Sequence, residues 1–218
     1  MSRNFFSVLA FAATAAFSVQ SAVATVDIAV NGGFETGSFS GWTQFPSGNP
    51  GAQTIVSPGA TNVAASAFAA RLNNTSPGSA NVLKNANIGV GVVGALSAIT
   101  VEFDAQFSAG PGGVAFAELF SELSGGGVSS SVLLGNAPLL GGAPFGWRHF
   151  SFTSVTGSDV SGGVTVQFNA ATGAFAGSTA DLQVDNLVVT VTPVPAPAFA
   201  SVFGLVGLAH VARRRRSV

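Results

Sequence analysis

Several segments of the chain alternate apolar and polar residues with a period of two, and this pattern constrains the fold more than any other feature of the sequence. In residues 99–107 (ITVEFDAQF) the odd positions are apolar and the even positions are polar. Residues 150–153 and 164–169 alternate in the same way. Because successive side chains of a β-strand point to opposite faces of the sheet, each segment is predicted to form a strand with one buried face.

Turn-forming residues separate the predicted strands at roughly even spacing. Clusters of Gly, Ser, Asn and Pro occur at 46–51, 73–78 and 124–127. Further strands are predicted at 26–30, 67–72, 116–123 and 181–192. The apolar residues of 116–123 also fit one face of a helix, but the neighbouring segments favour a strand. Many short strands between such turns are typical of an all-β sandwich or barrel, so we expect residues 25–192 to form one antiparallel β-sandwich.

The first 24 residues have the three parts of a secretory signal peptide. Arg3 supplies a positive charge, residues 5–19 are apolar, and Ala22 and Ala24 are the small residues that a signal peptidase requires. The alternative is a first helix of the fold, but no polar face or capping residue supports it. Residues 1–24 are therefore predicted to direct the chain to the translocon, in a signal helix that signal peptidase removes.

Residues 193–218 combine a proline-rich spacer, a short apolar segment and a terminal cluster of positive charges. As a helix, residues 198–212 would span about 22 Å at 1.5 Å per residue, whereas the hydrocarbon core of a membrane is about 30 Å thick. The charged residues are Arg213, Arg214, Arg215 and Arg216, which should remain on the cytoplasmic side. The sequence thus predicts a transient membrane anchor, with residues 25–192 outside the inner membrane. The alternative is an amphipathic helix that docks on the domain.

This order of motif, apolar segment and arginine cluster resembles the PEP-CTERM sorting tail of exported bacterial proteins. The motif is usually Val-Pro-Glu-Pro in that family, and here it is Val194, Pro195, Ala196 and Pro197, with alanine in place of glutamate. The resemblance implies that an exosortase, a membrane-embedded protease, cuts at this motif. The body would then be released to the cell surface or the extracellular matrix.

Two further motifs resemble jelly-roll domains related to carbohydrate-binding modules. Residues 31–37 (NGGFETG), followed by a Gly-Trp pair that contains Trp42, are similar to the opening of such domains. Residues 184–188 (VDNLV) are similar to their last strand. The resemblance implies a structural Ca²⁺ between Glu35 and Asp185, completed by loop carbonyl oxygens, since calcium takes six to eight oxygen ligands. The alternative is an exposed turn glutamate and an aspartate that caps a loop.

Trp42 and Trp147 are the only tryptophans, and the chain has no tyrosine. Exposed indole rings stack on sugar rings, so both residues are candidates for lining a glycan-binding groove. Each follows a glycine near the start of a predicted strand, which equally fits a position at the rim of the core.

The charge distribution excludes some classes of function. Between the two terminal segments, Arg71, Lys84 and Arg148 stand against nine acidic residues, a net charge of −6. Nucleic-acid binding requires a basic surface and is excluded. The chain has no cysteine, which excludes disulfides, thiol catalysis and cysteine-bound zinc. Apart from the calcium that the resemblance implies, no motif requires a cofactor.

The sequence offers little for catalysis. His149 is the only histidine of the body, and the common hydrolase motifs are absent. A glycosidase needs two carboxylates, which Glu102 with Asp104, or Glu118 with Glu122, would place on one strand face. We expect an exported, non-enzymatic protein of the cell surface or matrix, structural or adhesive in role, with exopolysaccharide as a further partner. The alternatives are a calcium-stabilised carbohydrate-binding module and, less favoured, a glycoside hydrolase.

Overall fold

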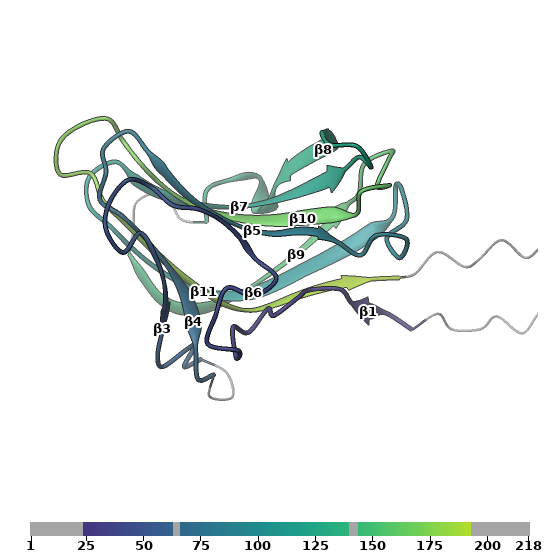
Figure 1. The fold of residues 1–218 in the computed structure, drawn as a ribbon, viewed down its shortest axis with the longest axis horizontal. Coiled ribbons are helices and arrows are strands. Elements are labelled where there is room, and N and C mark those ends of the chain that lie inside the picture. The colour runs from purple at the N-terminus through teal and green to yellow at the C-terminus, as the bar shows by residue number, and fades with distance from the viewer. Residues whose placement is uncertain (1–23, 63–65, 140–143, 193–218) are drawn as a thin grey trace, which may run out of the picture.

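The computed structural model describes residues 24–62, 66–139 and 144–192, which form eleven β-strands and one short 3-10 turn (Figure 1). The strands are β1 (Val26–Asp27), β2 (Thr43–Phe45), β3 (Gln53–Val56), β4 (Ala69–Asn74), β5 (Ala80–Ile88), β6 (Ala98–Ala109), β7 (Gly113–Glu122), β8 (Val128–Leu133), β9 (Phe145–Val155), β10 (Val164–Thr172) and β11 (Ala180–Val191). The 3-10 turn, η1, is Leu134–Asn136.

Two antiparallel sheets pack face to face (Figure 1). The first, sheet A, has the strand order β3-β4-β11-β6-β9, and the short β1 pairs with the end of β11. The second, sheet B, has the order β2-β5-β10-β7-β8. From β4 to β7, and again from β9 to β11, consecutive strands alternate between the two sheets, as in a jelly roll. The prediction of an all-β antiparallel sandwich is confirmed.

The core lies between the sheets and consists of the inward-facing residues of both. The apolar positions of the 99–107 pattern on β6 are all buried. The ring of Phe103 meets that of Phe168 on β10 edge-on, with 4.8 Å between centroids. Aromatic pairs of this geometry add roughly 0.5–1.5 kcal/mol beyond the burial of their surface. The alternating polar residues lie on the outer faces of the sheets, which are therefore the surfaces available for binding.

The strands agree with the long alternating segments and extend beyond them. The predicted segments at 99–107 and 164–169 lie within β6 and β10, and residues 116–122 lie in strand β7 and not in a helix. The first predicted strand is shorter than expected, because only two residues of β1 pair with β11. Strands β2, β3, β5 and β8 were not predicted. Strand β5 escaped prediction because Asn81 and Asn85 occupy two of its buried positions. Its buried and exposed residues therefore do not alternate between apolar and polar.

Most of the predicted signal peptide (1–23) and the whole predicted sorting tail (193–218) lie outside the described residues, so the two flanking helices remain predictions. Within the part of the chain that the structure describes, no helix is long and apolar enough to cross a membrane. Strand β1 pairs with the end of β11, so residues 24 and 192 lie at the same end of the sandwich (Figure 1).

Candidate functional site

Glu35 and Asp185, the two residues implied to share a calcium ion, both bind the segment that precedes β4. Asp185 lies at a β-bulge of β11 and is 1% exposed, and its Oδ2 accepts a hydrogen bond from the N–H of Ala60 at 2.8 Å. Glu35 Oε1 accepts hydrogen bonds from Ser66 Oγ at 2.6 Å and from the N–H of Ala67 at 3.1 Å. The fold thus brings the first and last motifs of the body together on one loop.

The two carboxylates have different environments. Burial raises the pKa of Asp185 above its ordinary value, and the nearby charge of Glu35 raises it further. Hydrogen bonds from Ala60, Ser66 and Asn186 act on this pKa in the opposite direction. The hydrogen bond from Ser66 lowers the pKa of Glu35, whose side chain is exposed. A buried carboxylate beside a second acidic group carries unfavourable electrostatic energy, which a bound cation would relieve.

Oxygen atoms crowd around Gly59 in this loop. A Cβ atom at position 59 would collide with Ser66 Oγ, the carbonyl oxygen of Phe68 and the carboxylate of Asp185. Glu35 Oε1 is hydrogen-bonded to Ser66 Oγ, so two carboxylates, a hydroxyl and a carbonyl oxygen gather there. This mixture suits calcium, which binds oxygen ligands of several kinds. Among the described residues no three His, Asp or Glu side chains are grouped to hold a metal, so uncharged oxygens would have to complete the site.

A third carboxylate, Asp104 of β6, lies beside Asp185 on the outer face of sheet A, and nothing in the sequence indicated that it is buried. The two residues are partners in the β6–β11 register, and Asp104 is also 1% exposed. Its Oδ1 accepts a hydrogen bond from Asn62 Nδ2 at 2.8 Å and lies 3.2 Å from His149 Nδ1. Its Oδ2 accepts one from Asn186 Nδ2 at 2.9 Å. Asp104 therefore helps to anchor the loop on sheet A.

In each carboxylate pair considered for glycoside hydrolysis, at least one member already accepts hydrogen bonds from neighbouring side chains. Asp104 is covered by the loop, while Glu102 Oε1 accepts a hydrogen bond from Ser151 Oγ at 3.0 Å. On β7, Glu118 Oε2 accepts a hydrogen bond from Gln167 Nε2 at 2.7 Å. A glycosidase needs room for a sugar and a water between its two carboxylates. The buried position of Asp104 does not offer that room.

The two tryptophans have different environments. Trp42 is 8% exposed, its ring stacks between Phe34 and Phe168, and its Nε1–H donates a hydrogen bond to the carbonyl oxygen of Asn31 at 3.0 Å. Trp42 is a core residue, which corrects its interpretation as a sugar platform, because no ring face is left for a ligand. Trp147 is half-buried in an irregular stretch of β9 and lines neither of the two hollows described next.

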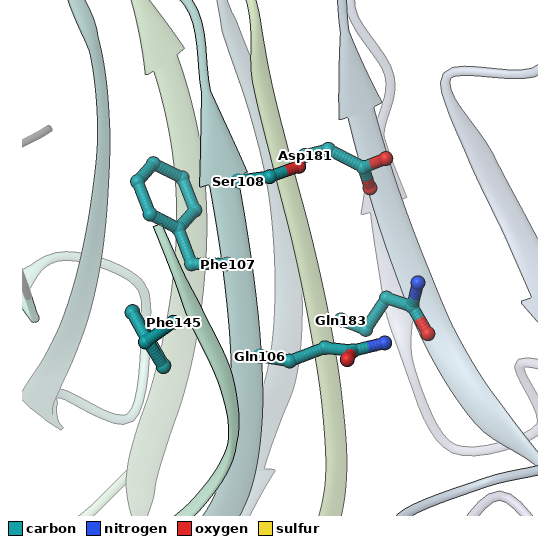
Figure 2. A pocket seen from close by; sticks show the side chains of 6 residues that line it. All are labelled: Gln106, Phe107, Ser108, Phe145, Asp181 and Gln183. Atoms are coloured by element: carbon teal, nitrogen blue, oxygen red, sulfur yellow. The ribbon is translucent and has the colours of Figure 1, made fainter. Parts of the chain in front are cut away.

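A shallow hollow of about 160 Å³ lies on the outer face of sheet A (Figure 2). Its amide side chains, Gln106 of β6 and Gln183 of β11, lie side by side because the two residues are register partners (Figure 2). The carboxylate of Asp181 already forms an ion pair with Arg71, whose Nε and Nη2 bind its two oxygens at 2.9 and 2.5 Å. It is therefore not free to bind a ligand. The two phenylalanines labelled in Figure 2 are almost fully buried, so this hollow offers no aromatic ring face to a ligand.

A larger hollow, of about 280 Å³, lies on the outer face of sheet B, and its lining surface is almost entirely apolar. It is lined by Phe45 of β2, Val82 and Lys84 of β5, and Gln167 of β10. Phe45 is 51% exposed, and its ring centroid lies 5.4 Å from Lys84 Nζ. Gln167 links the hollow to Glu118 of β7 through the 2.7 Å hydrogen bond described above. We call the surface formed by Phe45, Val82, Lys84, Gln167 and Glu118 the sheet B face.

Analysis of the sequence missed the sheet B face. Phe45 and Lys84 lie on β2 and β5, which the alternating pattern did not predict, so nothing placed them on a common surface. Gln167 occupied an outward position of the predicted strand 164–169, but a polar residue at such a position is ordinary. The one available signal was that Lys84 is the only lysine of the chain.

No family model matches the chain, and none of the curated proteins matches its sequence. Among solved structures, the enzymatically active domain of tailspike protein 4 from bacteriophage CBA120 superposes with a TM-score of 0.56 at 13% identity. The match covers 75% of this chain and 21% of that one, so this chain spans about a fifth of the tailspike domain.

A Stig cyclase from Fischerella sp. TAU superposes with a TM-score of 0.54 at 14% identity, over 78% of this chain and 99% of the cyclase. Carbohydrate-binding modules are also among the similar structures. The CBM22-1 xylan-binding domain from Paenibacillus barcinonensis has a TM-score of 0.46 at 12% identity, over 78% of this chain and 94% of that domain. The similarities to the tailspike domain and the cyclase, at 13% and 14% identity, show a similar fold alone, and function has to be argued from the site.

Proposed function

We propose that the body of this protein is an exported carbohydrate-binding module stabilised by calcium. The observation that carries the proposal is the sheet B face, where the exposed ring of Phe45 lines a hollow together with Lys84 and Gln167. Sugars have apolar ring faces and polar edges, so a site for them combines aromatic surface with a few hydrogen-bonding groups.

The strands hold the polar groups of this face at a fixed spacing. Lys84, Gln167 and Glu118 are successive register partners on β5, β10 and β7. Neighbouring strands lie about 4.8 Å apart, so the three residues span roughly 10 Å across the sheet. A row of this length suits a short stretch of a sugar chain, and its position on paired strands limits the entropy lost on binding.

Calcium would bind on the other sheet and have a structural role. Glu35 and Asp185 would hold it, together with Ser66 Oγ and the carbonyl oxygen of Phe68, which gather around Gly59. The ion would balance the negative charge of the buried Asp185, and it would join the loop to β11. Catalysis is not part of the proposal.

The proposal includes the export route that the sequence predicts. Residues 1–24 would carry the chain across the inner membrane, and residues 193–218 would hold it there as a PEP-CTERM-like tail. Cleavage at the Val194–Pro197 motif would release the body to the cell surface or matrix. An exopolysaccharide at that surface is then the nearest ligand for the sheet B face.

A structural or adhesive role without glycan recognition is the second candidate. The burial of Trp42 favours it, because sugar platforms usually present an exposed tryptophan or tyrosine and the core takes one of the two indoles. The two candidates differ in whether the sheet B face binds a polysaccharide.

Affinity electrophoresis of the full chain against a panel of polysaccharides tests the proposal. Loss of a stacking ring costs on the order of tenfold in affinity, so Phe45→Ala should weaken binding by about that factor. Phe175→Ala is the matched control, because Phe175 is 54% exposed in the loop after β10 and outside the sheet B face. A flat response across the panel, or an equal loss in both variants, would contradict the proposal and favour the structural role.

A further inference from the structure

We infer that the sheet B face selects acidic polysaccharides, whose sugar units carry carboxylates, and that Lys84 is the residue that selects them. The inference rests on the proposed function, because it names the class of glycan that the same face binds. It follows from the charge of Lys84, from its surroundings and from the position of Glu118.

The ammonium group of Lys84 has no ion-pair partner among the described residues. The ion pairs found there involve Arg71 with Asp181 and His149 with Glu102 and Asp104. Lys84 is also the only cation among the residues of the sheet B face, whereas the body as a whole has a net charge of −6. An unpaired cation on this face of an acidic protein is a place for a ligand carboxylate to bind.

Two aromatic rings flank this cation. Lys84 Nζ lies 5.4 Å from the ring centroid of Phe45 on β2 and 5.5 Å from that of Phe120 on β7. Rings at this distance attract an ammonium group and replace part of its hydration shell. Less water then has to be displaced when a carboxylate approaches, and the exposed ring of Phe45 offers apolar surface to the sugar that carries it.

The carboxylate of Glu118 should make the sheet B face prefer an acidic sugar over a polyanion that has no hydroxyl groups. It lies two strands from Lys84 in the same row, and Gln167 between them donates its hydrogen bond to Glu118. A ligand along this row meets a cation at one end and a carboxylate at the other. A sugar with one carboxylate and several hydroxyls fits both, because the hydroxyls donate to Glu118. A chain with an anion on every unit and no hydroxyls would be repelled there.

The test compares three polymers on the full chain in a non-ionic detergent. They are polygalacturonate, the neutral polymer made from it by carboxyl reduction, and polyglutamate. Polygalacturonate should bind about tenfold more tightly than the reduced polymer, with the preference falling as salt screens the ion pair. Polyglutamate should bind more weakly than polygalacturonate.

The outcomes separate this inference from the proposed function. Equal affinity for polygalacturonate and its reduced form, or preference for the reduced form, would overturn the selection by charge and leave glycan binding in place. Polyglutamate binding as tightly as polygalacturonate would overturn the selection of sugars. Binding to neither polysaccharide would overturn the inference, and the response across the polysaccharide panel would then decide the proposed function.

Variants assign the selection to Lys84. Lys84→Met keeps the length of the side chain and removes its charge, so the ratio of the two polysaccharide affinities should fall toward one. Lys84→Arg should retain a ratio well above one. Arg148→Met is the matched control, because it removes a positive charge from β9 on the other sheet and should leave the ratio as in the wild type. A Lys84→Met variant that keeps the full preference would overturn the inference.

Discussion

Asn186 bridges two buried carboxylates: its backbone N–H donates a hydrogen bond to Asp185 Oδ1 at 2.7 Å, and its side-chain amide donates one to Asp104 Oδ2 at 2.9 Å. The bridge depends on the β-bulge of β11, where Asn186 adopts a positive φ of 50°. Asparagine tolerates this conformation better than most residues. The bulge therefore supplies one further donor to each of two acidic side chains that are buried side by side.

Asn186→Gly should destabilise the fold by about 1–3 kcal/mol, because it leaves a buried carboxylate oxygen without its partner. Glycine accepts the positive φ, so the change isolates the lost amide. The free energy of unfolding from urea denaturation measures the effect. Asn136→Gly is the matched control, since Asn136 has a φ of 56° in an exposed turn. Equal losses in the two variants would contradict the bridging role.

The stability of the Asp185→Asn variant relative to the wild type should increase as the pH rises from about 3 to 7 in the presence of EDTA. Folding raises the pKa of Asp185 above its ordinary 3.8, mainly by burial. Such a group stabilises the fold below its unfolded pKa and loses that contribution as the pH rises through the folded pKa. The asparagine variant, which does not ionise, avoids this loss. Urea denaturation of both proteins across the pH range measures the difference.

Asp159→Asn is the control for this experiment, because the stability difference between this variant and the wild type should change with pH in the opposite direction. The backbone N–H of Ser161 lowers the pKa of Asp159, so the aspartate contributes stability above its unfolded pKa and loses it as the pH falls. Its variant should therefore lose stability relative to the wild type as the pH rises. Parallel trends in the two variants would contradict the assigned environment of Asp185.

Millimolar Ca²⁺ should raise the melting temperature of the full chain, because a ligand that binds only the folded state stabilises it. A shift on the order of 5 °C corresponds to a calcium concentration well above the dissociation constant. Glu35→Gln should reduce the shift, whereas Glu118→Gln, on the other sheet, should retain it. If Ca²⁺ does not shift the melting temperature of the wild type, the calcium site is contradicted, whereas the proposed role of the sheet B face is not affected.

Gly59→Ala should destabilise the fold and weaken any calcium shift. The added methyl group would collide with the carbonyl oxygen of Phe68 and the carboxylate of Asp185, and backbone at such a contact has to move. Overpacking of this kind costs typically about 1–3 kcal/mol. Gly48→Ala is the matched control, because no atom lies within 4 Å of the corresponding position. Similar melting temperatures for the two variants would contradict the crowding at Gly59.

The architecture could be predicted from the sequence where burial follows a strict alternation. Every inward residue of the 99–107 segment is apolar, and so β6 and the sandwich around it could be recognised. On β5, Asn81 and Asn85 point inward, and Asn85 binds the backbone of Val30 through both ends of its amide at 3.1 and 2.8 Å. Asn85 thus holds the N-terminal loop in place, whereas Asn81 binds Ala52 and Gln53 at the start of β3. Because both buried side chains are polar, a hydrophobicity pattern does not reveal this strand.

The candidate sites depended on contacts that no local pattern encodes. The motifs around Glu35 and Asp185 predicted that both carboxylates matter, and the fold brings them to one loop. The burial of Asp104 comes from Asn62, 42 positions away in the chain, and the sheet B face joins β2, β5, β10 and β7. Such sites exist only once the strand order is known, which the sequence pattern does not specify.

The intact mass of the protein recovered from the surface and supernatant of producing cells tests the export route. The sequence predicts a species that begins near Thr25 and ends at the Val194–Pro197 motif, because the signal peptide and sorting tail would both be removed.

Ala196→Glu restores the glutamate of the usual motif and should increase the cleaved fraction. Arg→Ser substitutions at all four of Arg213, Arg214, Arg215 and Arg216 should impair membrane retention of the precursor, since the positive charges that hold the tail are lost. A wild-type species that still ends at Val218, with no change in the Ala196→Glu variant, would mean that residues 193–218 are a plain anchor. The sheet B face would then act at the membrane and not in the matrix.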